Sequence, residues 1–513
     1  MPLLGSILKR TIELNRKLPK IRRNTNFRLQ EKALKKLLNK AEFTAFGEHY
    51  NFSRILADSN PVDAFRKTVP VHDYNSMFRQ WWYRSLNGEA FVTWPETVKY
   101  FALSSGTSEA SSKHIPVTKD MLRAIRRAST RQVLALAHLN LPPEVYQKGI
   151  LMLGGSTHLN FNGTYFSGDL SGITTGNLPF WFQHFYKPGN RIAREREWDT
   201  KLEEIVRSAK EWDIGIVCGV PAWMQILFER IIKHYNVGTI HDIWPNLSIY
   251  VWGGVSIKPY KAGFERLLAR PIHYLETYLA SEGFIGFQDD PEQPGNRLVL
   301  NNGIFFEFVP FNEQNFDGEG NMRAKPETLT IQQVDTNTEY ALLLSTCSGA
   351  WRYLIGDTIR FTNVDKACIE ITGRTKQFLS LCGEHLSQDN MNRAIELTAE
   401  ELGIPINEYT VAGINYQNLF AHHWYIACDE HVDPEKLKRT LDEHLKNLND
   451  DYRVERSAAL KEVIVDVLPH QVFLEWMRKQ GKEGGQHKFP RVLKHQRLED
   501  WRQFVQAHQQ PAG

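Results

Sequence analysis

The amino-acid sequence predicts an α/β protein with a large N-terminal domain and a smaller α+β C-terminal domain. The chain has 513 residues, which is more than one hydrophobic core usually serves. Beyond about residue 95, short apolar runs alternate with amphipathic helical stretches, a pattern typical of layered α/β domains. After about residue 374 the alternation gives way to a shorter mixture of strands and helices. We therefore predict two domains, at 1–375 and 376–513.

Apolar periodicity places the elements of the larger domain. Residues 1–50 are expected to be helical, with Leu34, Leu37, Leu38 and Ala41 on one face. The expected strands are Ile150–Leu153, Ile214–Cys218, Ser248–Trp252, Leu298–Leu300, Ile304–Val309 and Tyr340–Ser345, and the expected helices are Lys201–Glu211 and Ala222–His234. This alternation predicts β-sheets layered with helices.

The smaller domain is predicted from one capped helix among strand-like runs. Asp433 and Pro434 supply an N-cap and a first-turn proline, and the helix that follows carries leucines at helical spacing on one face. Strands are expected at Val411–Ile414, Trp424–Ala427 and Val463–Val467. The mixture predicts a small α+β domain.

The charge of the chain is nearly balanced, which bears on its partners. Lysine and arginine total 62 against 59 acidic residues, a formal net charge of +3. A protein that binds a polyanion usually shows a clear basic excess. The local clusters Lys20–Arg23 and Arg123–Arg127 are interpreted as solvated helix faces. We therefore expect no nucleic-acid partner.

Cysteine usage and hydropathy indicate the compartment. The five cysteines are dispersed and include no C-x-x-C pair, so neither a disulfide framework nor a zinc site is expected. The apolar run Met1–Leu8 is cut short by Lys9 and Arg10, and no later run approaches a membrane span. An N-terminal helix there is expected to pack on the body of the protein, with a membrane surface as the alternative. We expect a cytoplasmic monomer with no membrane partner.

A serine-rich loop is the most informative motif. Tyr100–Pro116 runs from apolar residues into small hydroxyl residues with one glycine and then Lys113. Backbone N–H groups and hydroxyls of such a loop can hold phosphate oxygens, and a lysine adds a cation. The loop lacks the second glycine of a Walker A motif, and a flexible serine-rich turn is the alternative. The residues expected to contact phosphate are Ser104, Ser105, Gly106, Thr107 and Ser108.

A second motif combines an aromatic ring with a carboxylate. Tyr278 precedes Glu282 by four residues, and Ser281 lies between them. The ring is suited to cover adenine, the hydroxyl to touch phosphate and the carboxylate to bind Mg²⁺. A turn with a solvated glutamate is the alternative. Upstream, Gly253 and Gly254 either let the backbone approach a flat ligand or form a tight strand-to-helix turn.

Three further motifs follow along the chain. Asp357 comes after Gly356 where a strand is expected to end. A carboxylate there can accept both ribose hydroxyls, or it can cap a turn. Arg374 and Lys376 lie at the expected domain boundary. Lys488 follows a glycine pair near the C-terminus, as a mobile catalytic arm would require, and a disordered basic tail is the alternative.

The order of these motifs resembles the adenylate-forming superfamily of acyl-CoA ligases, peptide-synthetase adenylation domains and luciferases. The residues within each motif narrow the resemblance to the Gretchen Hagen 3 family of acyl-acid amido synthetases, also labelled auxin-responsive promoter proteins. They are S-S-G-T-S at 104–108 followed by Lys113, Y-x-A-S-E at 278–282, F-F-E-F-V-P at 305–310, Y-x-x-G-D at 353–357 and Q-H-K-F-P-R at 486–491. The resemblance runs from about residue 25 to about residue 505. It implies the adenylate-forming enzyme fold, with a mobile C-terminal domain.

The resemblance implies a role for each motif residue. The residues implied to be catalytic are Lys113, Arg374 and Lys488, and Lys376 is implied to be the hinge. Those implied to bind ATP or AMP are the loop 104–108, the glycines 253 and 254, Tyr278, Ser281 and Asp357, and Glu282 is implied to bind Mg²⁺. We therefore expect Lys113, Glu282 and Asp357 to line one cleft.

The serine-rich loop departs from the family pattern at one place. Ala110 stands where many relatives have a second glycine, and Glu109 precedes it. Alanine strains a backbone position that needs a positive φ, and an acid pointing inward repels triphosphate. The departure bears on nucleotide affinity more than on the fold.

By resemblance, the protein uses ATP and Mg²⁺ to adenylate a carboxylic acid and passes the acyl group to an amine, in the family an amino acid. Adenylation gives the acid a stable leaving group, AMP. The transition state collects negative charge on phosphate oxygens, so Mg²⁺, lysines and backbone donors supply most of the catalysis. No covalent enzyme nucleophile is needed, and the sequence has no G-x-S-x-G elbow.

The substrates are not set by these motifs. Aromatic residues crowd the segment Phe161–Tyr186, which predicts either a pocket for an aryl or hydrophobic acid or ordinary core packing. An acyl-CoA ligase, in which a thiol replaces the amine, is the alternative enzyme. A nucleotide-binding protein without turnover is the alternative from another class.

Overall fold

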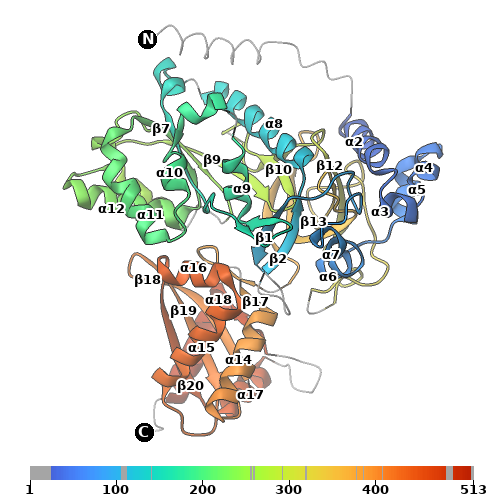
Figure 1. Cartoon of the computed structure of the whole chain (residues 1–513). Helices are drawn as coiled ribbons and strands as arrows, with labels where there is room; N and C mark the ends of the chain where they lie inside the picture. The colour runs from blue at the N-terminus through green and yellow to red at the C-terminus, as the bar shows by residue number, and fades with distance from the viewer. Residues whose placement is uncertain are drawn as a thin grey trace. The chain divides into compact units, whose positions relative to one another are not determined.

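The computed structural model describes residues 25–509, apart from 106–111, 140, 179, 255–256, 258–259, 292, 318–319, 377, 385, 407 and 481–488. By their internal contacts the described residues form two compact units (Figure 1). The first unit contains 25–104 and 114–375, and the second contains 105, 112–113 and 376–509.

An eleven-stranded mixed sheet is the centre of the first unit, with the order β12-β13-β14-β15-β11-β10-β9-β8-β7-β3-β6. Its parallel strands are β3 (Gly149–Leu153), β6 (Tyr186–Lys187), β7 (Ile214–Gly219), β8 (Ile249–Trp252) and β9 (His273–Ala280). Its antiparallel strands are β10 (Gly283–Phe287), β11 (Asn296–Leu298), β12 (Ile304–Pro310), β13 (Glu339–Thr346), β14 (Tyr353–Asn363) and β15 (Cys368–Arg374). The strand-and-helix layering confirms the predicted α/β class.

The parallel strands are continuous apolar runs because side chains on both of their faces are covered. Ile214, Val217 and Ile249 are all fully buried. The helices α11 (Trp198–Ser208) and α12 (Pro221–Tyr235) pack together beside β7 (Figure 1). The predicted strands and helices of this region are therefore confirmed, with ends shifted by a few residues.

A cluster of short N-terminal helices packs beside the antiparallel strands. They are α2 (Asn26–Ala41), α3 (Ala45–His49), α4 (Phe52–Ala57), α5 (Pro61–Thr68), α6 (Tyr74–Met77) and α7 (Tyr83–Leu86). Gln30 of α2 is buried, and its Nε2 donates to the carbonyl oxygens of Leu300 at 2.7 Å and Ile304 at 3.1 Å. Its Oε1 accepts from the backbone N–H of Phe306 at 2.7 Å. One glutamine thus fixes α2 to β12.

The serine-rich loop joins two strands of a separate four-stranded sheet with the order β2-β1-β5-β4. These strands are β1 (Tyr100–Ser105), β2 (Ser112–Val117), β4 (Asn160–Phe161) and β5 (Phe166–Gly168). Helix α8 (Lys119–Ala135) follows β2, and the Thr118 side chain caps it by accepting from the Met121 N–H at 3.1 Å. α8 packs on β10 (Figure 1). The first unit also contains the helices α9 (Leu170–Gly176), α10 (Asn190–Ala193) and α13 (Lys261–Leu267).

The second unit combines a four-stranded sheet with five helices among the described residues. The sheet has the order β20-β19-β18-β21, formed by β18 (Glu408–Tyr416), β19 (Leu419–Ala427), β20 (Leu460–Leu468) and β21 (Val492–Leu493), and a short pair β16 (Phe378–Leu379) and β17 (Leu386–Ser387) accompanies it. The helices are α14 (Gln388–Leu402), α15 (Pro434–Leu448), α16 (Asp450–Ser457), α17 (His470–Lys479) and α18 (His495–Gln509). Asp433 caps α15 by accepting from the Glu435 N–H at 3.0 Å. The predicted helix start is therefore confirmed.

Two local predictions were wrong. The strand expected at Leu298–Leu300 is Asn296–Leu298, and Val299 and Leu300 follow it as buried irregular backbone. An apolar run reports burial, and it does not distinguish a strand from buried irregular backbone. Asp357 was expected at a strand end, but it lies inside β14. The strand continues there because Asp357 pairs with Arg374 of β15, and Gly356, with φ +93°, lies where the pairing of β14 with β13 shifts register.

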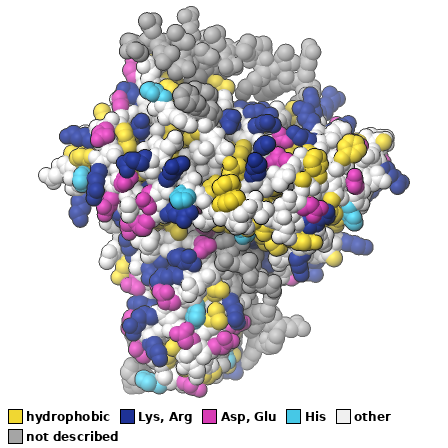
Figure 2. All heavy atoms as spheres, viewed as in Figure 1, with side chains coloured by type: hydrophobic (Ala, Val, Ile, Leu, Met, Phe, Trp, Pro, Cys, Tyr) yellow, Lys and Arg dark blue, Asp and Glu magenta, His cyan; other side chains and the backbone are white. Residues whose placement is uncertain are grey.

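The surface carries both signs of charge. On the face seen in Figure 2, basic and acidic side chains are interspersed on both units, in keeping with the small net charge of +3. None of the helices in the part of the chain that the structure describes combines the length and apolarity needed to cross a bilayer.

Candidate functional site

Three predicted site residues meet at one carboxylate. Asp357 of β14 and Arg374 of β15 are cross-strand partners, and Arg374 Nε donates to Asp357 Oδ1 at 2.7 Å. Tyr278 reaches the same group from β9, and its hydroxyl donates to Asp357 Oδ2 at 2.5 Å. Both carboxylate oxygens are therefore oriented by fixed donors.

Burial and charge keep Tyr278 and Arg374 protonated. Burial raises the pKa of Tyr278 well above its usual range, and the neighbouring Asp357 carboxylate raises it further. Tyr278 therefore remains a hydrogen-bond donor. Burial alone would lower the pKa of Arg374, but Asp357, Tyr278 and Glu282 outweigh it and the pKa is raised. The guanidinium thus remains a cation facing two carboxylates.

Glu282 stands beside this cluster. It lies in the turn between β9 and β10 with only 7% of its surface exposed, and its charge acts on Arg374, Tyr278 and Tyr353. Burial raises the pKa of the Tyr353 phenol well above its usual range, and the Glu282 charge raises it further. Ser281 lies in the same turn and is partly exposed. The second and third sequence motifs therefore come together in one place.

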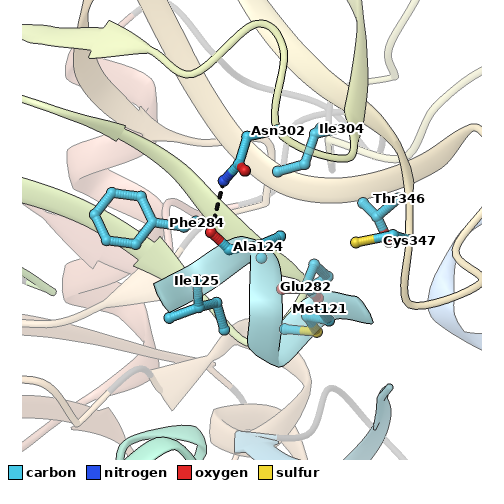
Figure 3. A pocket seen from close by; sticks show the side chains of 10 residues that line it. Met121, Ala124, Ile125, Glu282, Phe284, Asn302, Ile304, Thr346 and Cys347 are labelled. Atoms are coloured by element: carbon cyan, nitrogen blue, oxygen red, sulfur yellow. Dashed lines mark hydrogen bonds between the residues drawn. The ribbon is translucent and has the colours of Figure 1, made fainter. Parts of the chain in front are cut away.

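A small cavity adjoins Glu282 (Figure 3). Its volume is about 10 Å³, close to the smallest that can hold one water molecule. α8 covers it, and Asn302 Nδ2 donates to the Ala124 carbonyl oxygen of that helix at 2.7 Å, as the dashed line in Figure 3 shows. The other lining residues are Met121, Ile125, Gly283, Phe284, Ile304, Thr346 and Cys347. Helix α8 thus shields one side of the Glu282 region from solvent.

The chemistry of the donors fits one kind of metal binding. Among the residues that the structure describes, no group of three or more histidine, cysteine, aspartate or glutamate side chains is arranged to hold a metal ion. Mg²⁺ is commonly bound by one or two carboxylates together with the phosphates of a substrate. Glu282, a nearly buried carboxylate, fits the role of a protein ligand to such a nucleotide-bound ion.

The glycine pair supports the strand that carries Tyr278. A Cβ atom on Gly253 would lie 2.6 Å from the Thr277 carbonyl oxygen, so no side chain fits there without moving β9. Gly254 has φ +84°, a conformation that favours glycine. The pair allows the end of β8 to approach β9 directly next to the tyrosine.

The other predicted residues lie in other elements or outside the described residues. Ser104 is at the end of β1 and Lys113 is in β2, both partly buried. Lys376 is partly exposed in the bend that follows β15. The residues outside the described part are Gly106, Thr107, Ser108, Glu109, Ala110 and Lys488, together with the side chain of Ser105. The expectation that Lys113 shares a cleft with Glu282 and Asp357 stays a prediction.

Sequence reasoning gave no role to Arg352, which precedes Tyr353. Its guanidinium is nearly buried and donates to both Glu307 carboxylate oxygens, at 2.9 and 2.8 Å. It also donates to the Val69 carbonyl oxygen at 2.6 Å, and its backbone has φ +43°. The buried glutamate in F-F-E-F-V-P was the available signal, because a buried acid requires a partner. This ion pair fixes the backbone at the start of β14.

The aromatic segment after residue 161 does not form one cluster. Phe161 and Phe166 are 58% and 38% exposed, with ring centroids 4.6 Å apart on the four-stranded sheet. Tyr186 is instead buried in β6 of the large sheet. Among the described aromatic residues of this segment, packing thus divides between two sheets.

Three family models match the chain in order. The GH3 family N-terminal domain matches residues 16–187, the central domain matches 297–374, and the C-terminal domain matches 389–497. The chain belongs to the GH3 family. The family resemblance expected from the motifs is thus confirmed.

Individual GH3 relatives are distant. Indole-3-acetic acid-amido synthetase GH3.4 of Arabidopsis thaliana is 27% identical over 190 residues, which are 34% of this chain and 30% of that protein. The chain matches about a third of the length of the first few curated relatives. The solved structure of GH3.15 acyl acid amido synthetase aligns over 97% of this chain and 96% of its own, with a TM-score of 0.57 and 16% identity. A 2-hydroxyisobutyryl-CoA ligase aligns over 96% and 93%, with a TM-score of 0.56 and 11% identity. These likenesses confirm the adenylate-forming fold.

Proposed function

We propose that this GH3-family chain is an ATP- and Mg²⁺-dependent acyl-acid amido synthetase. It adenylates a carboxylic acid and then transfers the acyl group to an amine, an amino acid in the first instance, with release of AMP. The observation that carries the proposal is the meeting of Glu282, Tyr278, Asp357 and Arg374, which come from three sequence motifs far apart in the chain. Membership of the family supports it.

Asp357 is suited to hold ribose. A carboxylate offers about four lone-pair directions, and Tyr278 and Arg374 use two of them. The remaining directions can accept the two ribose hydroxyls without displacing either donor. The ring of Tyr278 then lies next to the ribose, near where adenine would bind.

A second set of residues is assigned to the phosphate end of ATP, away from the ribose. Glu282 would hold a nucleotide-bound Mg²⁺, which supplies positive charge to the phosphate oxygens when it is bound. Lys113 and the loop 104–108 would contact the phosphates, as would Lys488 in the late motif. Each of these groups offsets the negative charge that develops as the acid attacks the α-phosphorus.

The second half-reaction needs different groups around the same acyl-adenylate. We assign this change to rotation of the C-terminal residues 376–513 about Lys376. Arg374 would connect the nucleotide site to the hinge, because it binds Asp357 and lies two residues before Lys376.

The five cysteines, all free, support the proposal of a cytoplasmic protein, and we propose that it acts as a monomer.

Trapping of the activated acyl group tests the proposal. Hydroxylamine with ATP, Mg²⁺ and a mixed library of carboxylic acids would give hydroxamates that mass spectrometry identifies. Asp357→Ala, Glu282→Ala and Lys113→Ala should each reduce trapping about 100-fold or more. Glu370→Gln, an exposed carboxylate on the same strand as Arg374, is the matched control and should retain full trapping.

The acceptor is tested separately. Acid-dependent release of AMP that requires an amino acid supports an amido synthetase, whereas the same release with CoA and no amino acid indicates an acyl-CoA ligase. Absence of AMP formation across a broad acid and amine panel, despite ATP binding, indicates a nucleotide-binding protein without turnover. Full trapping by the three site variants would contradict the assigned site.

A further inference from the structure

Helix α2, at the outside of the first unit (Figure 1), carries positive charge on its exposed face. Its apolar residues are buried, and it packs on β12, α4 and α5. The opposite face presents Arg28, Lys32 and Lys36, all exposed and spaced four residues apart. Lys35 of the same helix pairs with Glu31 at 2.8 Å. Because α2 contains five basic residues and one acid, its exposed face has an excess of positive charge.

An exposed phenylalanine continues this row of cations. Phe43 follows Lys36 by seven residues, which is about two turns of helix, and the backbone of the intervening Glu42 is still helical, with φ −51° and ψ −44°. With 74% of its surface exposed, Phe43 is the most exposed large apolar side chain among the described residues. The α2 stripe, made of Arg28, Lys32, Lys36 and Phe43, therefore combines cations with an aromatic ring.

The sequence before α2 adds charge of the same sign. Residues 1–24 lie outside the described residues, and their sequence contains seven lysine or arginine residues and one glutamate. Residues 1–41 thus hold twelve basic and two acidic residues, a formal charge of +10. Because the whole chain carries +3, the remaining 472 residues carry −7. Apolar residues recur at helical spacing in the first segment, at Leu4, Ile7, Leu8 and Ile12.

This combination of charge and apolar residues distinguishes between anionic partners. Nucleic acid is held mainly by cations and hydrogen-bond donors on its phosphates, which leaves the aliphatic repeat without a role. An anionic bilayer interacts with both kinds of residue, because its headgroups attract lysine and arginine and its acyl boundary accepts apolar side chains. The charge and the apolar residues together therefore fit the surface of a membrane that contains anionic lipids.

We propose that the α2 stripe, together with the residues before α2, binds the surface of an anionic membrane. The three cations lie against lipid headgroups, and Phe43 lies at the boundary with the acyl chains. The contact is peripheral, since no helix in the described residues is long and apolar enough to span a bilayer. The sequence-based expectation of no membrane partner came from the lack of such a span, whereas the exposure of the α2 stripe is visible only in the structure. The proposal is independent of the proposed function, because it requires neither ATP nor an acid.

The test is co-sedimentation of the full-length chain with lipid vesicles. Vesicles of phosphatidylcholine and phosphatidylserine in equal parts should bind the wild type at least about tenfold more tightly than phosphatidylcholine alone, and added salt should weaken the binding. The double variant Lys32→Gln/Lys36→Gln should bind about 25-fold more weakly, because each cation near an anionic surface contributes a factor of about five. The matched control, Lys436→Gln/Arg439→Gln, removes two exposed cations from α15 and should bind like the wild type.

The apolar part of the contact is tested by a second pair of variants. Phe43→Gln should weaken binding to the anionic vesicles about tenfold, because the ring no longer leaves water for the acyl boundary. Leu474→Gln is its control, since Leu474 is 42% exposed on α17 in the second unit, and it should leave vesicle binding unchanged. All of the substituted side chains are exposed or partly exposed and lie outside the proposed nucleotide site, so hydroxylamine trapping in solution should be unchanged.

Three results would overturn the proposal. One is equal binding of the wild type to anionic and neutral vesicles, or an equal loss of binding in the α2 and α15 double variants. Another is tighter binding to duplex DNA than to the anionic vesicles, which would make nucleic acid the partner. The third is a dimer in sedimentation velocity that Phe43→Gln dissociates, without vesicle binding by the wild type, which would assign the α2 stripe to a second copy of the chain.

Discussion

The clearest stability prediction concerns Glu384, a fully buried acid in the second unit. Its carboxylate accepts from the backbone N–H of Leu381 at 2.9 Å, of Cys382 at 2.9 Å and of Gly383 at 3.2 Å, and His422 Nε2 lies 2.9 Å from Oε1. Burial alone would raise the pKa of Glu384, but the His422 hydrogen bond and charge, with the backbone donors, lower it to about 2. The ionised carboxylate therefore stabilises this unit.

The size of the effect follows from the shift. The pKa falls from 4.5 to about 2, and each unit corresponds to about 1.4 kcal/mol, so the ionised group contributes about 3 kcal/mol. Because the folded-state pKa is depressed, this contribution is complete above about pH 5.5 and is lost as the pH falls toward 2. About 1 kcal/mol of it should be gone at pH 4, and about 2 kcal/mol at pH 3.

Glu384→Gln tests this prediction. At pH 7 the variant should destabilise the second unit by about 3 kcal/mol, and its deficit should shrink between pH 5 and pH 3. Hydrogen exchange measured by mass spectrometry on the full-length chain reports the opening free energy of β18 and β19 directly. The control is Glu401→Gln, since Glu401 pairs with His444 at 2.9 Å but is 59% exposed. A deficit that equals the control's, or that stays constant from pH 7 to pH 3, would refute the reasoning.

Three further outcomes are expected in the first unit. Arg352→Met should lower the free energy of unfolding by about 3–5 kcal/mol in urea titrations, because it leaves the buried Glu307 charge with only the longer ion pair to Arg66 at 3.5 Å; a loss below 1 kcal/mol would contradict this. Gly253→Ala should lower unfolding stability by about 1–3 kcal/mol and raise the KM for ATP, because the new Cβ would lie 2.6 Å from the Thr277 carbonyl oxygen; unchanged stability and KM would show that β9 does not need this approach. Asp357→Asn should weaken ATP binding about tenfold in calorimetry, and unchanged affinity would exclude a ribose role.

Local patterns were sufficient for much of the fold. The apolar runs of β3, β7 and β8 and the capped start of α15 were predicted from the sequence, because a strand covered on both faces is a continuous apolar run and an N-cap directly precedes its helix. Local patterns failed at Val299 and Leu300, whose burial comes from surrounding elements and not from a strand of their own.

The sequence by itself determined which residue types stand at each motif, and with them the family. It could not determine which donor serves which carboxylate. Tyr278 binds Asp357, 79 positions away, while Glu384 is balanced by His422, 38 positions away. A buried charge needs a hydrogen-bond or ion-pair partner wherever it lies in the fold. That partner is the donor that the packing of the sheets brings to within about 3 Å of it. That choice belongs to the tertiary structure, because sequence separation carries no information about distance across a sheet.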